Sequence, residues 1–314
     1  MTASESRART RAALAVPLLA LLWGLNWVAV RVVLREVAPW TLRATGLGLG
    51  AALLFAFALA RGDRLRVARG QWPRLVAASL LTIAGFNVLV AFAQLAGTTS
   101  RAAILTYTMP IWAIALAWPV LGERPDRRRA IALGLGAAGL ALLAAPLLDA
   151  PHAGAGAALA CGGGLSWAAG TVLAKRLPVD AAPVPMTAWQ LAIGALAAGA
   201  GMLAFEGVPV PRMLGAPAAL ALAYHVVLAM ALAYFLWFEV IARLPAGTAA
   251  LGTLGVPVVG VAGAMALLGE RPSAADLAGF ACVLAAATIA LRAGPAVIHA
   301  RAAGTPADGA RDLL

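Results

Sequence analysis

Long runs of apolar residues fill most of this chain, and short polar segments separate them. A helix rises about 1.5 Å per residue, so roughly 20 apolar residues cross the hydrocarbon core of a bilayer. On that criterion the pattern predicts ten membrane-spanning helices, at residues 13–34, 40–60, 75–96, 100–121, 130–148, 154–174, 186–205, 217–242, 246–268 and 275–292. A membrane β-barrel would instead show alternating segments of about ten residues. The pattern therefore predicts an all-α integral membrane protein.

The composition agrees with a membrane-embedded chain. Hydrophobic residues make up 62% of the chain and charged residues 12%, whereas charged residues make up about 25% of a typical soluble domain. The formal net charge of +11 would suit nucleic-acid binding, but the basic residues lie in short runs between apolar stretches, as they do in membrane loops. We therefore expect the lipid bilayer, and not nucleic acid, as a partner.

The placement of the basic residues predicts the orientation in the membrane. Along a ten-helix path, most of the 24 Lys and Arg residues fall on the side of the N-terminus, as in the loop at 61–74. Loops rich in positive charge usually lie in the cytoplasm. Both terminal segments, residues 1–12 and 293–314, are therefore expected to be cytoplasmic. The apolar run at 13–34 exceeds the core of a signal peptide, which has about 7–15 residues, and is predicted to be an uncleaved first helix.

The four residues Gly-Glu-Arg-Pro occur twice, and the similarity around them extends upstream. Residues 98–125 align with residues 245–272, and a weaker match pairs residues 23–34 with residues 167–178. The chain therefore consists of two similar halves, each with five predicted helices. Because five is odd, the second half must cross the membrane in the opposite direction. We predict two inverted five-helix repeats, at residues 13–148 and 154–292.

Charge differs between the two copies in the way that inversion requires. Arg127, Arg128 and Arg129 follow the first Gly-Glu-Arg-Pro, whereas residues 274–276, Ala-Ala-Asp, follow the second. A cytoplasmic loop keeps its arginines, and a loop on the other side loses them. Inverted repeats are typical of transporters, in which a site near the middle of the membrane opens first to one side and then to the other. A duplication that only makes a stable bundle is the alternative.

The motifs resemble those of one group of carriers. Trp23, Gly24 and Asn26 open the first helix, and the fourth helix carries a proline and ends in Leu-Gly-Glu-Arg-Pro. Residues 233–251, followed by Pro257 and the second Gly-Glu-Arg-Pro, look like part of a second copy. Over residues 13–292 the chain resembles the drug/metabolite transporter superfamily, in its EamA-like family. The resemblance implies a ten-helix carrier in the cell inner (plasma) membrane, where many members export amino acids or related metabolites.

Two prolines, Pro110 and Pro257, occupy equivalent positions within predicted helices. A proline kinks its helix and frees the carbonyl one turn earlier, here those of Thr106 and Thr253. Broken backbone inside a membrane is tolerated where it is buried in protein or lines a cavity. We expect these four residues to line a central cavity, and a kink that serves packing is the alternative.

Polar and aromatic side chains inside the predicted spans are the candidates for substrate binding. Polar groups in hydrocarbon usually face the interior of the bundle, and aromatic rings beside amides or phenols suit a small amphipathic solute. The predicted substrate-binding residues are Asn26, Trp27, Asn87, Tyr107, Trp167, Gln190, Tyr234 and Trp237. The alternative roles are hydrogen bonds between helices and anchoring at the membrane surface.

Two titratable residues of the predicted eighth helix, His225 and Glu239, are the candidates for proton coupling, since a histidine titrates near neutrality and burial shifts a carboxylate toward it. The alternative for Glu239 is an ion pair with Arg243, one helical turn away. Small multidrug antiporters of the same superfamily hold a coupling glutamate near the middle of the first helix. This chain has no acidic residue there, which disfavours multidrug proton antiport.

Motifs of other functional classes are absent from the sequence. It contains no GxxxxGK[ST], GxSxG or HExxH, the patterns of nucleotide binding and of hydrolysis. Cys161 and Cys282 lie in separate apolar runs and predict neither a disulfide nor a metal site. We therefore expect no enzyme activity, no cofactor and no metal.

The sequence as a whole predicts a secondary transporter that exports a small metabolite, a neutral or aromatic amino acid, by alternating access. No buried charge stands out, so the ionic groups of this small-molecule substrate are expected to bind freed carbonyls and helix termini. Three alternatives stay open: efflux of multidrug or cationic compounds, a lipid-type flippase, and a membrane enzyme or scaffold. We expect the carrier to act as a monomer or a weak homo-oligomer.

Overall fold

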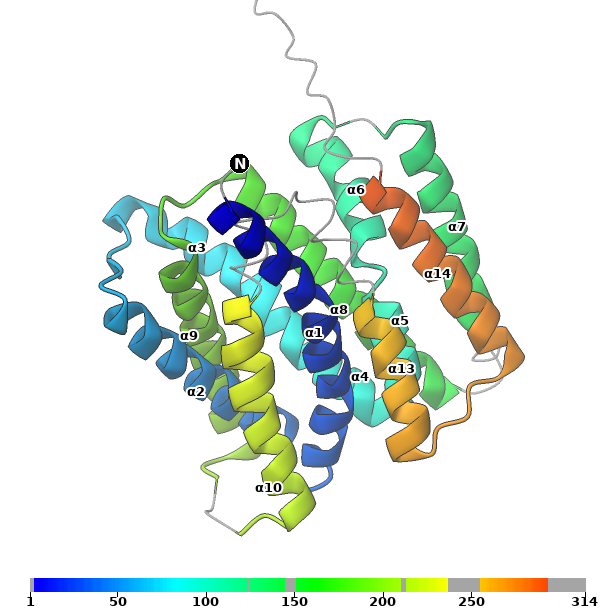
Figure 1. Cartoon of the computed structure of the whole chain (residues 1–314). Coiled ribbons are helices and arrows are strands. Elements are labelled where there is room, and N and C mark those ends of the chain that lie inside the picture. The colour runs from blue at the N-terminus through cyan, green and yellow to red at the C-terminus, as the bar shows by residue number, and fades with distance from the viewer. Residues whose placement is uncertain (1–2, 124, 145–150, 210–212, 237–254, 293–314) are drawn as a thin grey trace, which may run out of the picture.

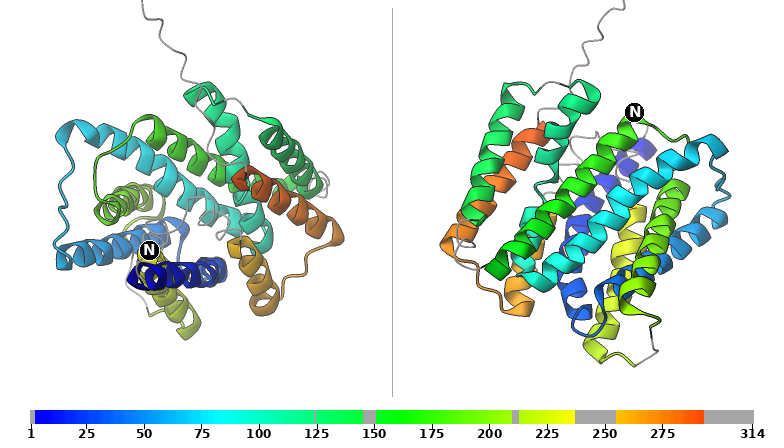
Figure 2. Two further views of the ribbon diagram at one scale, coloured as in Figure 1. Left: turned by 45° about the horizontal axis from the view of Figure 1, so that its top comes forward. Right: turned by 180° about the vertical axis from the view of Figure 1, so that it is seen from behind.

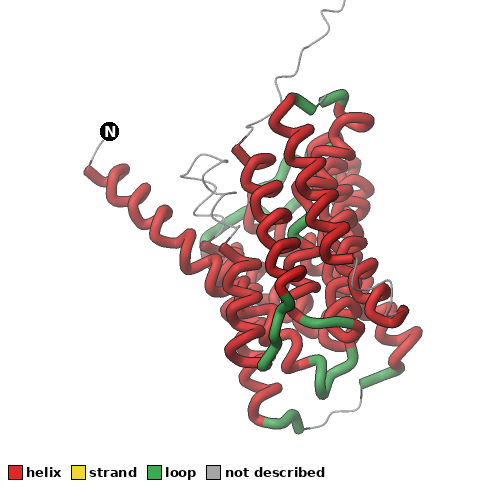
Figure 3. Tube along the Cα trace, turned by 90° about the vertical axis from the view of Figure 1, so that its right-hand side faces the viewer, coloured by secondary structure: helices red, strands yellow, loops and turns green. Residues whose placement is uncertain are grey.

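The computed structural model describes residues 3–123, 125–144, 151–209, 213–236 and 255–292, which form helices and loops and no strand. The helices run along a common direction, and the beginning of the first helix projects from the bundle (Figures 1 and 3). For this part of the chain, the prediction of an all-helical protein is therefore confirmed.

Twelve α-helices are described in the two halves of the chain. The first half contains α1 (Ala3–Val33), α2 (Pro39–Ala60), α3 (Trp72–Ser79), α4 (Phe86–Ala96), α5 (Thr99–Thr106), α6 (Met109–Leu121) and α7 (Arg127–Ala144). The second half contains α8 (Pro151–Arg176), α9 (Pro183–Gly201), α10 (Ala216–Ala223), α13 (Gly255–Leu268) and α14 (Ala274–Arg292). Three π-helical segments continue them: η2 (Leu80–Gly85) joins α3 to α4, η4 (Met202–Glu206) extends α9, and η5 (Tyr224–Leu232) extends α10.

The helices have the length and composition of membrane spans. Seven described helical stretches are long and apolar enough to cross a bilayer, and three shorter apolar helices lie at Ala130–Leu143, Gly255–Leu268 and Ala274–Ile289. Each corresponds to one of the predicted spans. Parts of the predicted spans 217–242 and 246–268 lie outside the described residues, so the count of ten stays a prediction.

Both copies of Gly-Glu-Arg-Pro end a helix in the same way. Gly122 and Gly269 have φ values of 73° and 70°, the left-handed conformation that glycine adopts without a steric cost and that commonly ends helices. In each copy the N–H of the following glutamate donates to the carbonyl of an alanine near the helix end, Ala117 or Ala264, at 3.2 Å. The α6–α7 loop lies at the top of Figure 1, which we call the upper end, and the α13–α14 loop lies at the lower end.

Small residues allow close packing between equivalent helices of the two halves. α2 packs extensively against α9, and α7 packs extensively against α14 (Figure 2). At the second crossing, a Cβ on Gly139 would lie 3.0 Å from the carbonyl oxygen of Gly279, and a Cβ on Gly279 would lie 3.1 Å from that of Gly139. In lipid the hydrophobic force between helices is weak, so van der Waals contact between backbones becomes important.

Substitution of Gly139 tests this crossing. Gly139→Ala places a methyl group 2.9 Å from the Cβ of Cys282, so we expect the free energy of unfolding to fall by about 1–3 kcal/mol, the usual cost of overpacking. The matched control is Gly134→Ala on the same helix, where a Cβ meets nothing within 4 Å. Thermal unfolding in detergent measures both variants, and equal melting temperatures would contradict a tight crossing at Gly139.

Candidate functional site

The first helix and the π segment η5 are joined by side-chain hydrogen bonds. The Tyr224 hydroxyl donates to the Leu22 carbonyl (2.9 Å), and the Trp23 indole N–H donates to the Ala229 carbonyl (3.0 Å). A π-helix is wider than an α-helix, and such segments often occur at functional sites. Here a side chain of η5 bonds the backbone of α1, and a side chain of α1 bonds the backbone of η5. We call this contact the α1–η5 seam.

His225 and Asn26 form the polar centre of the seam. His225 is 1% exposed, and its Nδ1–H donates to Oδ1 of Asn26 (2.8 Å). An amide oxygen can only accept, so this contact places a ring proton on Nδ1. His225 Nε2 is buried without a hydrogen-bond partner in the described structure, and a Cβ on Gly46 of α2 would lie 2.5 Å from it. One residue predicted for substrate binding and one predicted for proton coupling thus contact each other.

Aromatic rings lie beside this polar pair. Trp23 packs edge-on against Tyr234, with ring centroids 5.6 Å apart and an interplanar angle of 71°. Trp23 lies three residues before Asn26 on α1, so its ring and the amide share one face of the helix. The structure therefore places the Trp23–Tyr234 pair about one turn of α1 from Asn26 and its partner His225. Trp23 is not among the predicted substrate-binding residues.

A buried arginine, which is not among the residues predicted from the sequence, lies beside this pair. Arg43 lies in the second turn of α2 and is 3% exposed. Its Nε is buried without a hydrogen-bond partner in the described structure, and Arg43 lies about one helical turn before Gly46, which packs against His225. The expectation that no buried charge stands out is therefore wrong. The missed signal was a lone arginine inside the predicted span 40–60. We call Asn26, Arg43 and His225 the polar cluster.

The helix break near Pro110 packs against α8. α5 ends at Thr106 and α6 begins at Met109, with Pro110 in its first turn. Thr106 is fully buried, and a Cβ on Gly164 of α8 would lie 2.7 Å from its carbonyl oxygen. The carbonyl that the proline frees thus faces a glycine of α8. A cavity-lining role for Thr106 and Pro110 stays a prediction.

Three other predicted residues lie on α1, α4 and α8. Trp27 is buried and packs against α13. Asn87 donates from Nδ2 to the Ile83 carbonyl one turn earlier (2.9 Å). Trp167 packs edge-on against Phe86, with ring centroids 4.9 Å apart. These three side chains serve contacts within or between helices, and their part in substrate binding stays a prediction.

The remaining predicted residues are only partly described. Tyr107 and Gln190 are half-buried, and Pro257 is buried in the first turn of α13. Trp237, Glu239 and Thr253 lie outside the described residues.

Two acidic residues clasp the start of α5 at the lower end. Glu270 accepts hydrogen bonds from the N–H groups of Thr99 (2.6 Å) and Ser100 (2.9 Å) and from the Ser100 hydroxyl (2.6 Å). Asp276 accepts from the Arg101 guanidinium (2.7 Å). The first N–H groups of a helix have no partner within it, and a carboxylate also complements the partial positive charge there. These contacts, which we call the clasp, join the α13–α14 loop and the first turn of α14 to α5.

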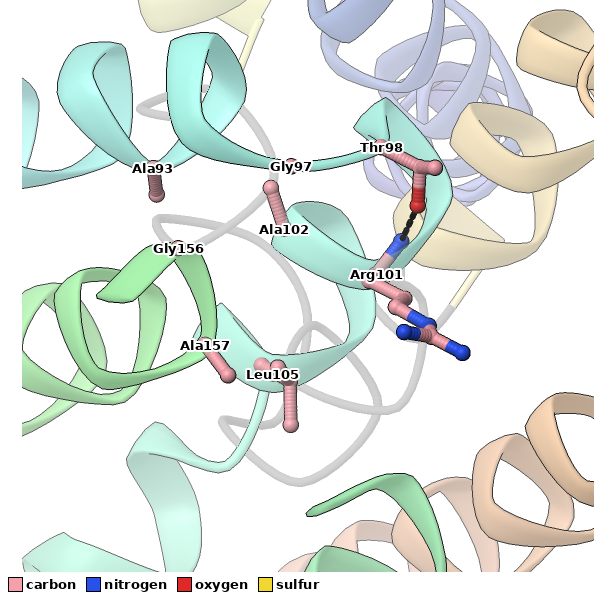
Figure 4. A pocket seen from close by; sticks show the side chains of 8 residues that line it. All are labelled: Ala93, Gly97, Thr98, Arg101, Ala102, Leu105, Gly156 and Ala157. Atoms are coloured by element: carbon pink, nitrogen blue, oxygen red, sulfur yellow. Dashed lines mark hydrogen bonds between the residues drawn. The ribbon is translucent and has the colours of Figure 1, made fainter. Parts of the chain in front are cut away.

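A cavity of about 150 Å³ lies beside the clasp, where α4, α5 and α8 meet (Figure 4). Its lining residues are mostly small: Ala93, Gly97, Thr98, Arg101, Ala102, Leu105, Gly156 and Ala157. In Figure 4 the Arg101 guanidinium points away from the other lining side chains, and it is bonded to Asp276. The cavity therefore offers few polar groups to a ligand, and the polar cluster is the better candidate site.

Apolar helices of membrane-spanning length, joined at buried polar contacts, define a helical integral membrane protein. Sequence comparison makes the assignment narrower, because the model of the EamA-like transporter family matches residues 10–145 and again residues 154–292. The chain belongs to the EamA-like transporter family. It is therefore a multi-pass membrane protein of the transporter class, as the motifs predicted.

Individual relatives agree with the family match. The chain is 27% identical over 279 residues to the "Uncharacterized transporter YvbV" of Bacillus subtilis, covering 88% of this chain and 90% of that one. It is 28% identical over 286 residues to the "Probable amino-acid metabolite efflux pump" of Salmonella typhimurium, covering 85% of this chain and 90% of that one. A solved crystal structure with 23% identity matches at a TM-score of 0.63, over 89% of this chain and 97% of that chain, which shows a shared fold.

The clasp predicts unequal roles for the two motif glutamates. Glu270→Ala leaves the first N–H groups of α5 without their partner, so we expect the free energy of unfolding to fall by about 1–2 kcal/mol, as for the loss of a helix cap. Glu123, the same position in the first copy, pairs with the half-exposed Lys175, and exposed ion pairs contribute about 0–1 kcal/mol. Glu123→Ala is therefore the control. Unfolding in detergent compares the two, and equal losses would refute the clasp.

Proposed function

We propose that the chain is a secondary transporter that exports a small metabolite, a neutral or aromatic amino acid, by alternating access across the cell inner (plasma) membrane. The family match is the observation that carries the transport function. The relative named as a probable amino-acid metabolite efflux pump supports the substrate class and the direction. The α1–η5 seam adds support, since an amide, an imidazole and two aromatic rings suit a small amphipathic solute.

Alternating access needs two halves that can exchange conformations, and we propose that these are inverted repeats of five helices each, at residues 13–148 and 154–292. The family model matches each half separately. The two motif loops lie at opposite ends of the bundle (Figure 1). Equivalent helices pack together, α2 with α9 and α7 with α14. A pseudo-twofold axis that exchanges the two halves would carry each helix of such a pair onto the other, so pairs of equivalent helices support this symmetry.

The distribution of charge supports an orientation. We propose that the upper end, with the run Arg127–Arg129, the start of α1 and the end of α14, faces the cytoplasm, and that both terminal segments are cytoplasmic. The clasp then closes the outer end of the bundle. Glu123 is the equivalent of Glu270 at the cytoplasmic end, and the residues equivalent to Thr99 and Ser100, at 246–247, lie outside the described residues. In the proposed cycle the two motif glutamates hold the two ends closed in turn.

Residues of the two motif loops test this orientation. In a background where Cys161 and Cys282 are replaced by alanine, we expect Arg127→Cys to react with a membrane-impermeant thiol reagent only from the cytoplasmic side. Ala274→Cys, at the equivalent position of the second copy, is expected to react only from outside. Both native side chains are exposed, so reaction of both cysteines from one side would rule out inverted repeats.

Positive charge at the polar cluster favours amino acids over cationic drugs as substrates. Arg43 is buried, and no carboxylate lies within 4 Å of it in the described structure. A cationic compound that reached this cluster would meet a like charge in a medium of low dielectric constant, where repulsion is strong. A zwitterionic amino acid also has a carboxylate, which offsets the positive charge of Arg43.

Transport into proteoliposomes tests the proposal directly, with a panel of neutral and aromatic amino acids, cationic drugs and a labelled phospholipid. We expect amino-acid flux, reduced about tenfold by Asn26→Ala, because the buried His225 then loses its partner at a cost of about 1–3 kcal/mol. Tyr234→Ala is expected to weaken transport by removing the ring that packs on Trp23. The control is Thr171→Ala, whose exposed hydroxyl bonds its own helix.

The same assay separates the alternative functions. Drug flux without amino-acid flux would identify a multidrug carrier, and transfer of the labelled phospholipid would identify a flippase. Repeating the assay with and without a pH gradient tests proton coupling, for which we propose His225 and Glu239. Flux that is equal under both conditions would remove them from that role.

A further inference from the structure

We propose that Arg43, together with Asn26 and His225, forms an anion-binding subsite that receives the carboxylate of the transported solute. The inference rests on the proposed function, since it takes the chain to carry a small solute. It adds a chemical requirement, because the solute must carry a carboxylate. It also replaces the expectation from sequence that freed carbonyls and helix termini alone recognise the ionic groups.

The burial of Arg43 without a counter-charge is the first observation. Arg43 lies within the span Pro39–Ala60 and is 3% exposed. The described ion pairs are Arg61–Asp63, Arg101–Asp276 and Lys175–Glu123, none of which involves it. Charged groups inside a membrane protein are costly unless paired, and they commonly mark the paths of substrates or ions. An arriving carboxylate would supply the missing charge.

An acidic residue at the start of α2 is already engaged. Glu206 accepts hydrogen bonds from the N–H groups of Trp40 and Thr41 and from the Thr41 hydroxyl, each at 2.8 Å. Glu206 therefore serves as the cap of α2 and leaves the guanidinium without an ion pair. Because Glu206 already offsets the partial positive charge at the start of α2, the attraction for an anion must come from Arg43 itself.

The neighbours of Arg43 supply further polar groups. His225 is 1% exposed, its Nδ1–H is used by Asn26, and its Nε2 has no partner in the described structure. Because Oδ1 of Asn26 accepts from His225, the amide N–H groups of Asn26 remain as donors. A guanidinium binds a carboxylate through two parallel N–H groups. Three helical segments thus place the buried Arg43, which has no ion pair in the described structure, near the amide donors of the half-buried Asn26.

The position of the subsite suits a carrier. Asn26 and Arg43 belong to the first half of the chain, whereas His225 belongs to the second. A solute bound there would contact both halves, as a site does in alternating access. The rings of Trp23 and Tyr234 lie about one turn away along α1, so an amino acid could place its carboxylate at Arg43 and its side chain against the aromatic pair.

The test compares acids with their uncharged or cationic analogues, using the full-length protein. In proteoliposomes, we expect L-phenylalanine to compete for transport at least tenfold better than L-phenylalaninamide, which lacks the carboxylate. Arg43→Gln should abolish that preference, and competition by L-phenylalaninamide should change less than twofold in this variant. Arg43→Lys should keep part of the preference. The control is Arg35→Gln, an exposed arginine at the same end, which should behave as the wild type. A preference that persists in Arg43→Gln would overturn the proposal.

A second measurement keeps the subsite testable if transport fails. In detergent, phenylacetate should raise the melting temperature of the wild type and phenylacetamide should not, at equal ionic strength, because binding to the native state stabilises it. Without ligand, Arg43→Gln should melt at the same temperature as the wild type or higher, since the substitution removes an unpaired buried charge. If Arg43 had a purely structural role, the variant would melt at a lower temperature than the wild type. Stabilisation by phenylacetate without amino-acid transport would refute the proposed function and support the subsite. Equal effects of phenylacetate and phenylacetamide on the wild type would refute the subsite.

Discussion

Every backbone N–H and C=O group inside the bilayer needs a partner within the protein, because hydrocarbon offers none. Continuous helices meet this need, so the points where helices start, stop or widen are the places where other groups must act. Glu270 supplies acceptors to the first N–H groups of α5, and Glu206 does the same for α2. At the interruption between α5 and α6, the Thr108 carbonyl accepts from the N–H groups of Ile111 and Trp112. The irregular segments are thus satisfied locally.

The same constraint explains the α1–η5 seam. A widened helix exposes backbone to its neighbours, and here the Trp23 indole bonds the carbonyl of Ala229 within η5. The bonds that join α1 to η5 are few and directional, whereas α7 and α14 meet through glycine backbone. Two kinds of contact therefore join the halves. Close glycine packing tolerates little change, and a polar seam can exchange its hydrogen bonds with a solute, which is why we place the substrate at the seam.

One repeated motif is used differently at its two occurrences. In both copies a left-handed glycine ends the helix and the next glutamate follows it into a loop. The second copy carries Asp276 where the first carries arginine, so the second loop can bind Arg101 of α5 as well. The first loop, rich in arginine, has Lys175 as the described partner of its glutamate. The change from arginine to aspartate at this position thus also changes which residues the two copies of the motif bind.

Local sequence was enough to predict the helical spans, since the transfer of a segment into hydrocarbon depends mainly on its own side chains. The repeat and the family also follow from sequence, because both are properties of residue order. The pairing of polar residues does not. Asn26 and His225 are 199 positions apart, and only the packing of α1 against η5 makes them neighbours.

The burial of Arg43 shows the same limit. An arginine near the end of an apolar run commonly extends to the membrane surface, so the position of Arg43 inside the predicted span 40–60 did not by itself predict its burial. The packing of η5 on α2 at Gly46 places His225 about one helical turn from this arginine. Helix positions were therefore decided by hydrophobicity along the chain, whereas the charge and hydrogen-bond donors of the candidate site were decided by which helices met, because burial and pairing are properties of contacts between segments.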